Sequence, residues 1–180
     1  MLIKDICIIN PKSTINHYDY INYIDTSSVI DGTLLETQYL TKNYPSRAKR
    51  QLKINDILIS SVRPNLKHNY YVHCNYDNLI GSTGFIQLRV NNENVHPKYL
   101  YYFLTSRNCI SKYINVAETS QTTFPSFNKD VIENIVFPNI SLNEQVHIVN
   151  TISSALISLL LFLLIVYFLQ ISLIILEITF

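Results

Sequence analysis

Apolar and polar positions alternate along several short segments in the first half of the chain, which predicts strands. Residues 20–28 alternate in this way and are followed by a turn at Asp31-Gly32. Residues 56–64 end at a proline, while residues 81–90 open with a glycine-bounded turn and continue as a strand. We therefore predict a sheet, with strands within 1–12, 20–28, 56–64, 81–90 and 131–138.

A helical period replaces this alternation further along the chain. Residues 96–114 have a proline near the first turn and apolar residues at the spacing of an amphipathic helix. Ser141 and Glu144 have the spacing of a capping box, so a second helix should begin close to residue 142.

Length and composition fit one globular domain with a structured appendage. The chain has 180 residues, of which 48% are hydrophobic and 12% aromatic, so it can bury a core and is not a disordered chain. Together with the patterns above, these features predict the α/β class. We expect one domain with a mixed β-sheet and packed helices over residues 1–140, followed by a C-terminal helix over 141–180.

Positive charge is concentrated in one segment, although the whole chain carries a formal charge of only +1. Residues 42–67 hold seven Lys and Arg residues against one acid, Asp56. The segment lies on both sides of a predicted strand and contains Tyr, Ser, Asn and His, which donate to phosphates and base edges. A solvated surface would also suit this composition, but the expected convergence of charge favours nucleic acid as the partner.

The sequence lacks the motifs of the enzymes that its size would allow. It has no glycine-rich cofactor loop, no P-loop run ending in Lys-Ser/Thr, and no carboxylates clustered with a lysine. The five histidines have no ligand-like spacing, and the three cysteines are too far apart for a Cys-x-x-Cys pair, which suits a reducing interior. We therefore expect a binding protein with no catalytic residue, no metal site and no cofactor.

Five segments, in their order along the chain, resemble the specificity subunit of type I restriction-modification systems, and in particular its target recognition domain. They are YIDTSSV (23–29), YPSRAKRQLKINDILISSVRPNL (44–66), GSTGFIQLR (81–89), PKYLYYFLTS (97–106) and FPNISLNEQVHIVNTI (137–152). The second segment and the strand-to-helix junction in the last are characteristic of such subunits. The resemblance covers about residues 1–154.

The resemblance implies a cytoplasmic protein that recognises one half of a split sequence in double-stranded DNA and performs no chemistry. Methyltransferase (modification) subunits would bring S-adenosylmethionine, and a separate restriction subunit would bring ATP-driven translocation and cleavage. A complete subunit has two recognition domains separated by long helices, whereas this chain has room for one. It therefore looks like a half-subunit, a fragment or one product of a split gene, and two half-subunits could pair by two-fold symmetry.

Candidate DNA contacts follow from a division of labour in which basic residues position the protein and polar residues at loop tips specify the bases. The phosphate candidates are Arg47, Lys49, Arg50 and Lys67, with His68 among their basic neighbours. Arg63 and Asn65 lie where a strand ends at Pro64 and are candidates for base edges. Two loops supply further base-reading candidates, for which ordinary turn chemistry is the alternative: Ser82, Thr83, Gln121, Thr122 and Thr123.

The sequence departs from the family pattern near Ala155, where a charged spacer helix is expected. Residues 155–176 are almost entirely apolar and long enough to cross a bilayer, but no Lys or Arg follows Lys129 to orient a span. Our preferred interpretation is a shift of reading frame near Ala155, which could leave an inactive remnant. A buried or partner-facing helix stays open, as does a membrane anchor, which would make the chain a membrane-anchored interaction protein with a basic face.

Overall fold

The computed structural model describes residues 1–13, 18–120 and 123–179, with side chains described as far as residue 171. The chain divides into two compact units, Met1–Ile140 and Ser141–Phe180. The first unit contains the sheets and the short helices, and the second consists of one long helix.

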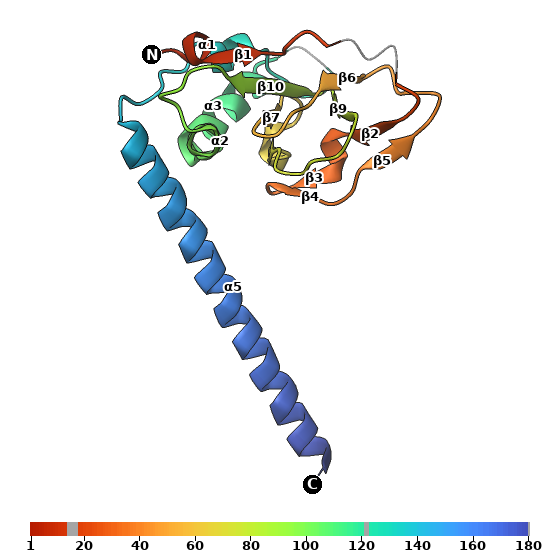
Figure 1. Ribbon diagram of the computed structural model, residues 1–180, viewed down its shortest axis with the longest axis vertical. Helices are drawn as coiled ribbons and strands as arrows, with labels where there is room; N and C mark the ends of the chain where they lie inside the picture. The colour runs from red at the N-terminus through yellow and green to blue at the C-terminus, as the bar shows by residue number, and fades with distance from the viewer. Residues whose placement is uncertain (14–17, 121–122, 180) are drawn as a thin grey trace. The chain divides into compact units, whose positions relative to one another are not determined.

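The first sheet has the strand order β1-β10-β7-β8, and all its pairs are antiparallel. The strands are β1 (Cys7–Ile9), β10 (Phe85–Val90), β7 (Ile57–Ser60) and β8 (Tyr70–Tyr71). Helices from four segments share a hydrophobic core with one face of this sheet: α1 (Ile3–Ile6), α2 (Pro97–Leu104), α3 (Arg107–Glu118) and α4 (Asp130–Glu133). Figure 1 shows α1 beside β1, and α2 and α3 next to each other below β10. Ile59 and Leu88 of the sheet are fully buried in this core, as are Leu100 and Tyr113 of the helices.

The second sheet is mixed and has the order β5-β2-β9-β6, with β2 and β9 parallel. Its strands are β5 (Gln38–Leu40), β2 (Ile21–Ile24), β9 (Leu79–Ser82) and β6 (Ala48–Gln51). Ile24 and Leu79 of this sheet belong to one hydrophobic cluster with Leu58 and Phe85 of the first sheet. The strands β7 and β10 are therefore buried on both faces, which fixes the direction in which the chain leaves them.

Short elements connect the strands. The hairpin of β3 (Val29–Ile30) and β4 (Thr33–Leu34) turns at Asp31 and Gly32, whose φ angles are 45° and 82°. Positive φ at both central residues is typical of a tight hairpin turn, and it confirms the predicted turn. Two 3-10 helices are η1 (Thr26–Ser28), which follows β2, and η2 (Pro64–Leu66), which follows β7.

The structure confirms the predicted α/β class and the strands predicted within 20–28, 56–64 and 81–90. The prediction of a single helix over 96–114 is wrong, because the helix is interrupted after Leu104 and the segment forms two helices, α2 and α3. The Thr105 hydroxyl donates to the Tyr101 carbonyl at 2.8 Å, a bond that competes with continued helix.

Two other predicted strands need correction. The strand predicted at 131–138 is wrong, since the chain forms α4 there and an isolated bridge joins Val136 to Leu2. The first segment forms a strand only at Cys7–Ile9, because α1 occupies the residues before it. The buried residues Ile3 and Ile6 are spaced by three positions, which fits one face of a helical turn.

The second unit is the helix α5 (Leu142–Thr179), whose start confirms the prediction. The Ser141 backbone N–H donates to a Glu144 carboxylate oxygen at 2.8 Å, and the Glu144 N–H donates to the Ser141 hydroxyl at 3.3 Å, which completes the capping box. Residues Leu142–Ile171 are long and apolar enough to cross a membrane, by length and composition. Apolar side chains on every side of this helix are exposed, from Leu156 to Leu169.

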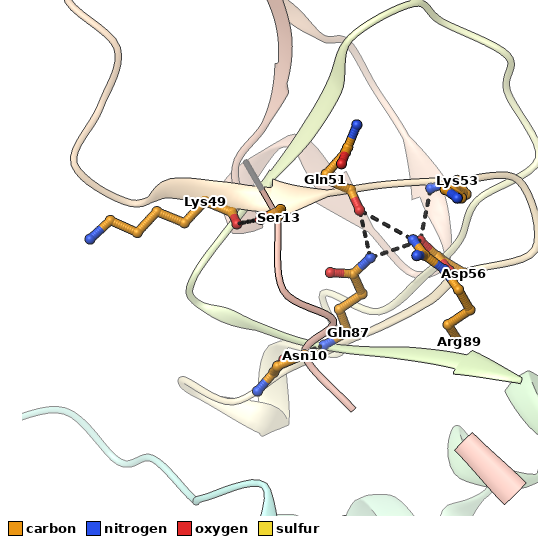
Figure 2. A network of polar contacts seen from close by, with 8 residues as sticks. All are labelled: Asn10, Ser13, Lys49, Gln51, Lys53, Asp56, Gln87 and Arg89. Carbon is orange, nitrogen blue, oxygen red and sulfur yellow. Dashed lines mark hydrogen bonds and ion pairs between the residues drawn. The ribbon is translucent and has the colours of Figure 1, made fainter. Parts of the chain in front are cut away.

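One buried carboxylate connects the two sheets. Asp56 is 0% exposed and lies just before β7, where Arg89 of β10 binds it through Nε at 2.8 Å and a terminal nitrogen at 2.7 Å. Gln87 donates to the same carboxylate at 2.8 Å and also to the carbonyl of Gln51, at the end of β6. The backbone N–H of Lys53 completes the set at 2.8 Å (Figure 2). The network therefore ties β10 of the first sheet to β6 of the second.

We predict that Asp56→Asn destabilises the first unit by about 3 kcal/mol, because it leaves Arg89 without its charge partner. This is the low end of the usual range for a broken buried pair, since the Arg89 side chain is 26% exposed. Denaturant unfolding followed by circular dichroism measures the change. The matched control is Asp130→Asn, which removes an exposed carboxylate 4.0 Å from Lys129 and should have a much smaller effect. Equal effects of the two substitutions would contradict a structural role for the network.

Candidate functional site

Four loops of the first unit are joined by backbone hydrogen bonds beyond the end of β7. We call them the joined loops: residues 45–48, 61–69, 82–84 and 123–127. The Arg63 N–H donates to the Pro125 carbonyl at 2.8 Å, and the Phe127 N–H donates to the Ser61 carbonyl at 3.0 Å. In the other direction, the Ser61 N–H donates to the Gly84 carbonyl at 2.9 Å.

The first of the joined loops is bound through the turn between β9 and β10. The Thr83 N–H donates to the Arg47 carbonyl at 2.8 Å. Thr26 of η1 packs closely on the same turn, since a Cβ added at Gly84 would lie 2.9 Å from the Thr26 Cγ2. A side chain at position 84 would therefore push η1 away, and glycine allows the close approach. Segments distant in sequence thus form one ordered surface.

A cleft of 250 Å³ lies on this surface, and we call it the arginine cleft. It brings together three of the predicted DNA contacts, Arg47, Arg63 and His68. Its remaining lining residues are Thr26, Ser27, Val62, Leu66 and Phe124. The cleft therefore combines two guanidinium groups with hydroxyls and an aromatic ring, which suits an anionic or hydrogen-bond-accepting ligand.

Arg63 has a backbone conformation that only surrounding contacts can hold. Its φ of 50° and ψ of 59° are left-handed, which costs a residue with a side chain about 1–3 kcal/mol. Its N–H is bound by Pro125, and its carbonyl accepts from the Leu66 N–H at 2.9 Å. The guanidinium carbon lies 4.6 Å from the centre of the Phe124 ring, within cation–π range. Both backbone and side chain of Arg63 are thus placed by neighbours.

The other predicted residues lie outside the arginine cleft. Lys67, also left-handed at φ 51°, lines a hollow of 180 Å³ with Asp31 and Tyr101. Lys49 lines a hollow of 550 Å³ with Tyr18 and Tyr44.

Arg50 and Thr83 line a further hollow, of 350 Å³, with Asn10 and Asn128. Burial lowers the pKa of Arg50, and its buried Nε has no hydrogen-bond partner among the residues that the structure describes. The basic residues predicted as phosphate contacts are therefore distributed over several hollows rather than gathered in one.

The predicted base-reading residues differ in exposure. Asn65 is exposed on η2, and Thr83 and Thr123 are exposed on their loops. Ser82 is fully buried, and its hydroxyl accepts from the Gly84 N–H at 3.3 Å, so it shapes the turn. Gln121 and Thr122 lie outside the described residues. Sequence reasoning missed Thr26, Ser27 and Phe124, which line the arginine cleft.

The charges of the cationic segment are free of internal ion pairs. Asp56, the one acid of residues 42–67, is bound by Arg89 from another strand. Among the described residues, no carboxylate forms a salt bridge with Arg47, Lys49, Arg63 or Lys67. Figure 2 shows the Lys49 side chain extending away from the Asp56 network. The positive potential of these residues is therefore available to an external partner.

Comparison with known proteins gives a family and a fold. The family described as Type I restriction modification DNA specificity domain matches residues 1–159. The specificity subunit of the type I restriction enzyme HindI from Haemophilus influenzae is 28% identical over 128 residues, which is 71% of this chain.

Two solved structures have the same fold. The HsdS subunit from Thermoanaerobacter tengcongensis superposes with a TM-score of 0.78 at 23% identity, over 88% of this chain. A chain from a structure of the type I R-M system gives a TM-score of 0.73 at 24% identity, over 87% of this chain. The chain spans 28% of the length of the curated relative and 42% and 41% of the two solved chains.

Proposed function

The chain belongs to the Type I restriction modification DNA specificity domain family, and from this premise we propose that its first unit recognises one half of a split DNA target. The observation that carries the proposal is the arginine cleft, where the joined loops place Arg47, Arg63 and His68 together. No carboxylate in the described part of the chain forms a salt bridge with either arginine. An ordered cationic surface with hydroxyl donors fits double-stranded DNA, which offers phosphates and base edges side by side.

The joined loops support a division between positioning and base recognition. Arg47 and Lys67 are exposed and form no salt bridge among the described residues, so we assign them to phosphate contacts. We assign Lys49 to a phosphate contact as well. Arg50 is a weaker candidate, since it is partly buried. Asn65, Thr83 and Thr123 present short polar side chains at loop tips and are assigned to base edges.

In this proposal the chain itself is non-catalytic and works in the cytoplasm within a larger complex. Methyltransferase subunits and a restriction subunit supply the chemistry, with their own cofactors. The curated relative carries the name of a specificity subunit of a type I restriction enzyme, which supports this assignment of partners. We further propose that two copies can pair by two-fold symmetry, which would present two recognition domains.

A second candidate function follows from α5. Its residues Leu142–Ile171 fit the length and composition of a membrane span, which favours a membrane-anchored protein whose basic surface meets anionic lipid. Fractionation of cells expressing the full chain separates the two functions, because an anchored chain stays with membranes after a high-salt wash. In that case, removal of residues 155–180 should release it. Recovery of the full chain in the soluble fraction would exclude the anchor.

We predict that Arg47→Ala and Lys67→Ala each weaken binding to all duplexes alike. Loss of one phosphate contact should lower the slope of log affinity against log salt concentration by about one unit. Fluorescence anisotropy with duplexes of unrelated sequence, measured over a range of salt concentrations, gives this slope.

The control for this experiment is Lys4→Ala, because Lys4 is an exposed lysine on α1 and lies outside the joined loops. Its substitution should leave the slope unchanged. If the slope of the Arg47 or Lys67 variant equals that of the parent, the residue concerned is not at the interface.

A further inference from the structure

The guanidinium group of Arg63 lies over an aromatic ring, which distinguishes it from the other described cations of residues 42–67. Phe124 covers one face of it, with the guanidinium carbon 4.6 Å from the ring centre. The Phe124 side chain belongs to the loop whose Pro125 carbonyl accepts from the Arg63 N–H. The ring and the guanidinium therefore belong to two loops that are joined by backbone hydrogen bonds. An isolated β-bridge between Val62 and Ser126 lies next to them.

When a guanidinium stacks on an aromatic ring, its N–H donors still point outward in the guanidinium plane and can bind a ligand. Its N–H donors form a rigid fork that matches two neighbouring acceptors. Among the described residues, no salt bridge involves Arg63, and no side-chain or backbone oxygen accepts from its guanidinium. The paired acceptors O6 and N7 of guanine in the major groove suit this fork.

We infer that Arg63 is a specificity-determining residue that binds the O6 and N7 edge of one guanine, and that Phe124 is its positioning residue. The inference rests on the proposed DNA recognition and adds the base, the residue and the side chain that orients it. Phe124 remains 51% exposed, so the pair lies at the surface where a groove can reach it.

The alternative for Arg63 is a phosphate contact, and the geometry favours the base. A phosphate can accept both arms of a guanidinium, but it also accepts a lysine as a point charge and needs no orienting ring. Arg63 instead has a left-handed backbone held at both its N–H and its carbonyl, and a side chain held by an aromatic face. Such ordering is useful when the guanidinium must bind two base acceptors at fixed angles.

The test is a binding-site selection with the full chain and a library of randomised duplexes, sequenced before and after selection. The variants are Arg63→Lys, Phe124→Ala and Phe124→Tyr, with Arg47→Ala as the phosphate control. We expect the parent to enrich guanine at one position. Arg63→Lys keeps the charge but loses the planar fork, and it should reduce that preference by about 5- to 150-fold while preferences at other positions persist.

Phe124→Ala should reduce the preference at the same position, and Phe124→Tyr, which keeps the ring, should retain it. Arg47→Ala should weaken binding without changing the preference at any position. A guanine preference that survives Arg63→Lys overturns the inference and leaves the proposed function intact. If Phe124→Ala keeps the preference, Phe124 has no positioning role. A parent chain that enriches no base at any position overturns the proposed function, and the inference with it.

Discussion

The bidentate bond between Asp56 and Arg89 is the interaction on which the rest of the first unit depends. It lies inside the fold, where an unpaired carboxylate would be strongly unfavourable, and it recruits Gln87 and the carbonyl of Gln51. By joining β10 to the end of β6 it fixes one sheet against the other. It also removes the one acid of residues 42–67 from the surface, so the surrounding cations are left for a partner.

Fixed sheets allow the loops at their edges to be ordered. Because β7 and β10 are buried on both faces, the chain leaves β7 in a defined direction and enters the left-handed turn at Arg63. Hydrogen bonds from Ser61 to Gly84 and from Arg63 to Pro125 then bind three separate loops together. Under the proposed function, such a surface would meet DNA with little further ordering and would hold side chains at the angles that distinguish one base from another.

The sequence predicted what depends on neighbours along the chain and missed what depends on distant partners. The strand at 56–64 and the capping box of Ser141 have local patterns, and both are present. The pairing of Asp56 with Arg89 crosses 33 positions, and no local pattern indicates it. The same holds for Phe124, which reaches Arg63 only through the tertiary fold. Arg47 was predicted from the concentration of charge and Arg63 from its place at the end of a strand, but their meeting in one cleft required the structure.

Amide hydrogen exchange of the full chain, measured with and without duplex DNA, tests the central claim that the joined loops are the DNA-binding surface. Amides of surface loops, including hydrogen-bonded ones, exchange through local opening, and their exchange slows when a partner covers the loops and opposes that opening. The account predicts slower exchange on DNA binding in residues 45–48, 61–69, 82–84 and 123–127, which lie far apart in sequence. Slower exchange confined to α2 and α3, with these four segments unchanged, would contradict it.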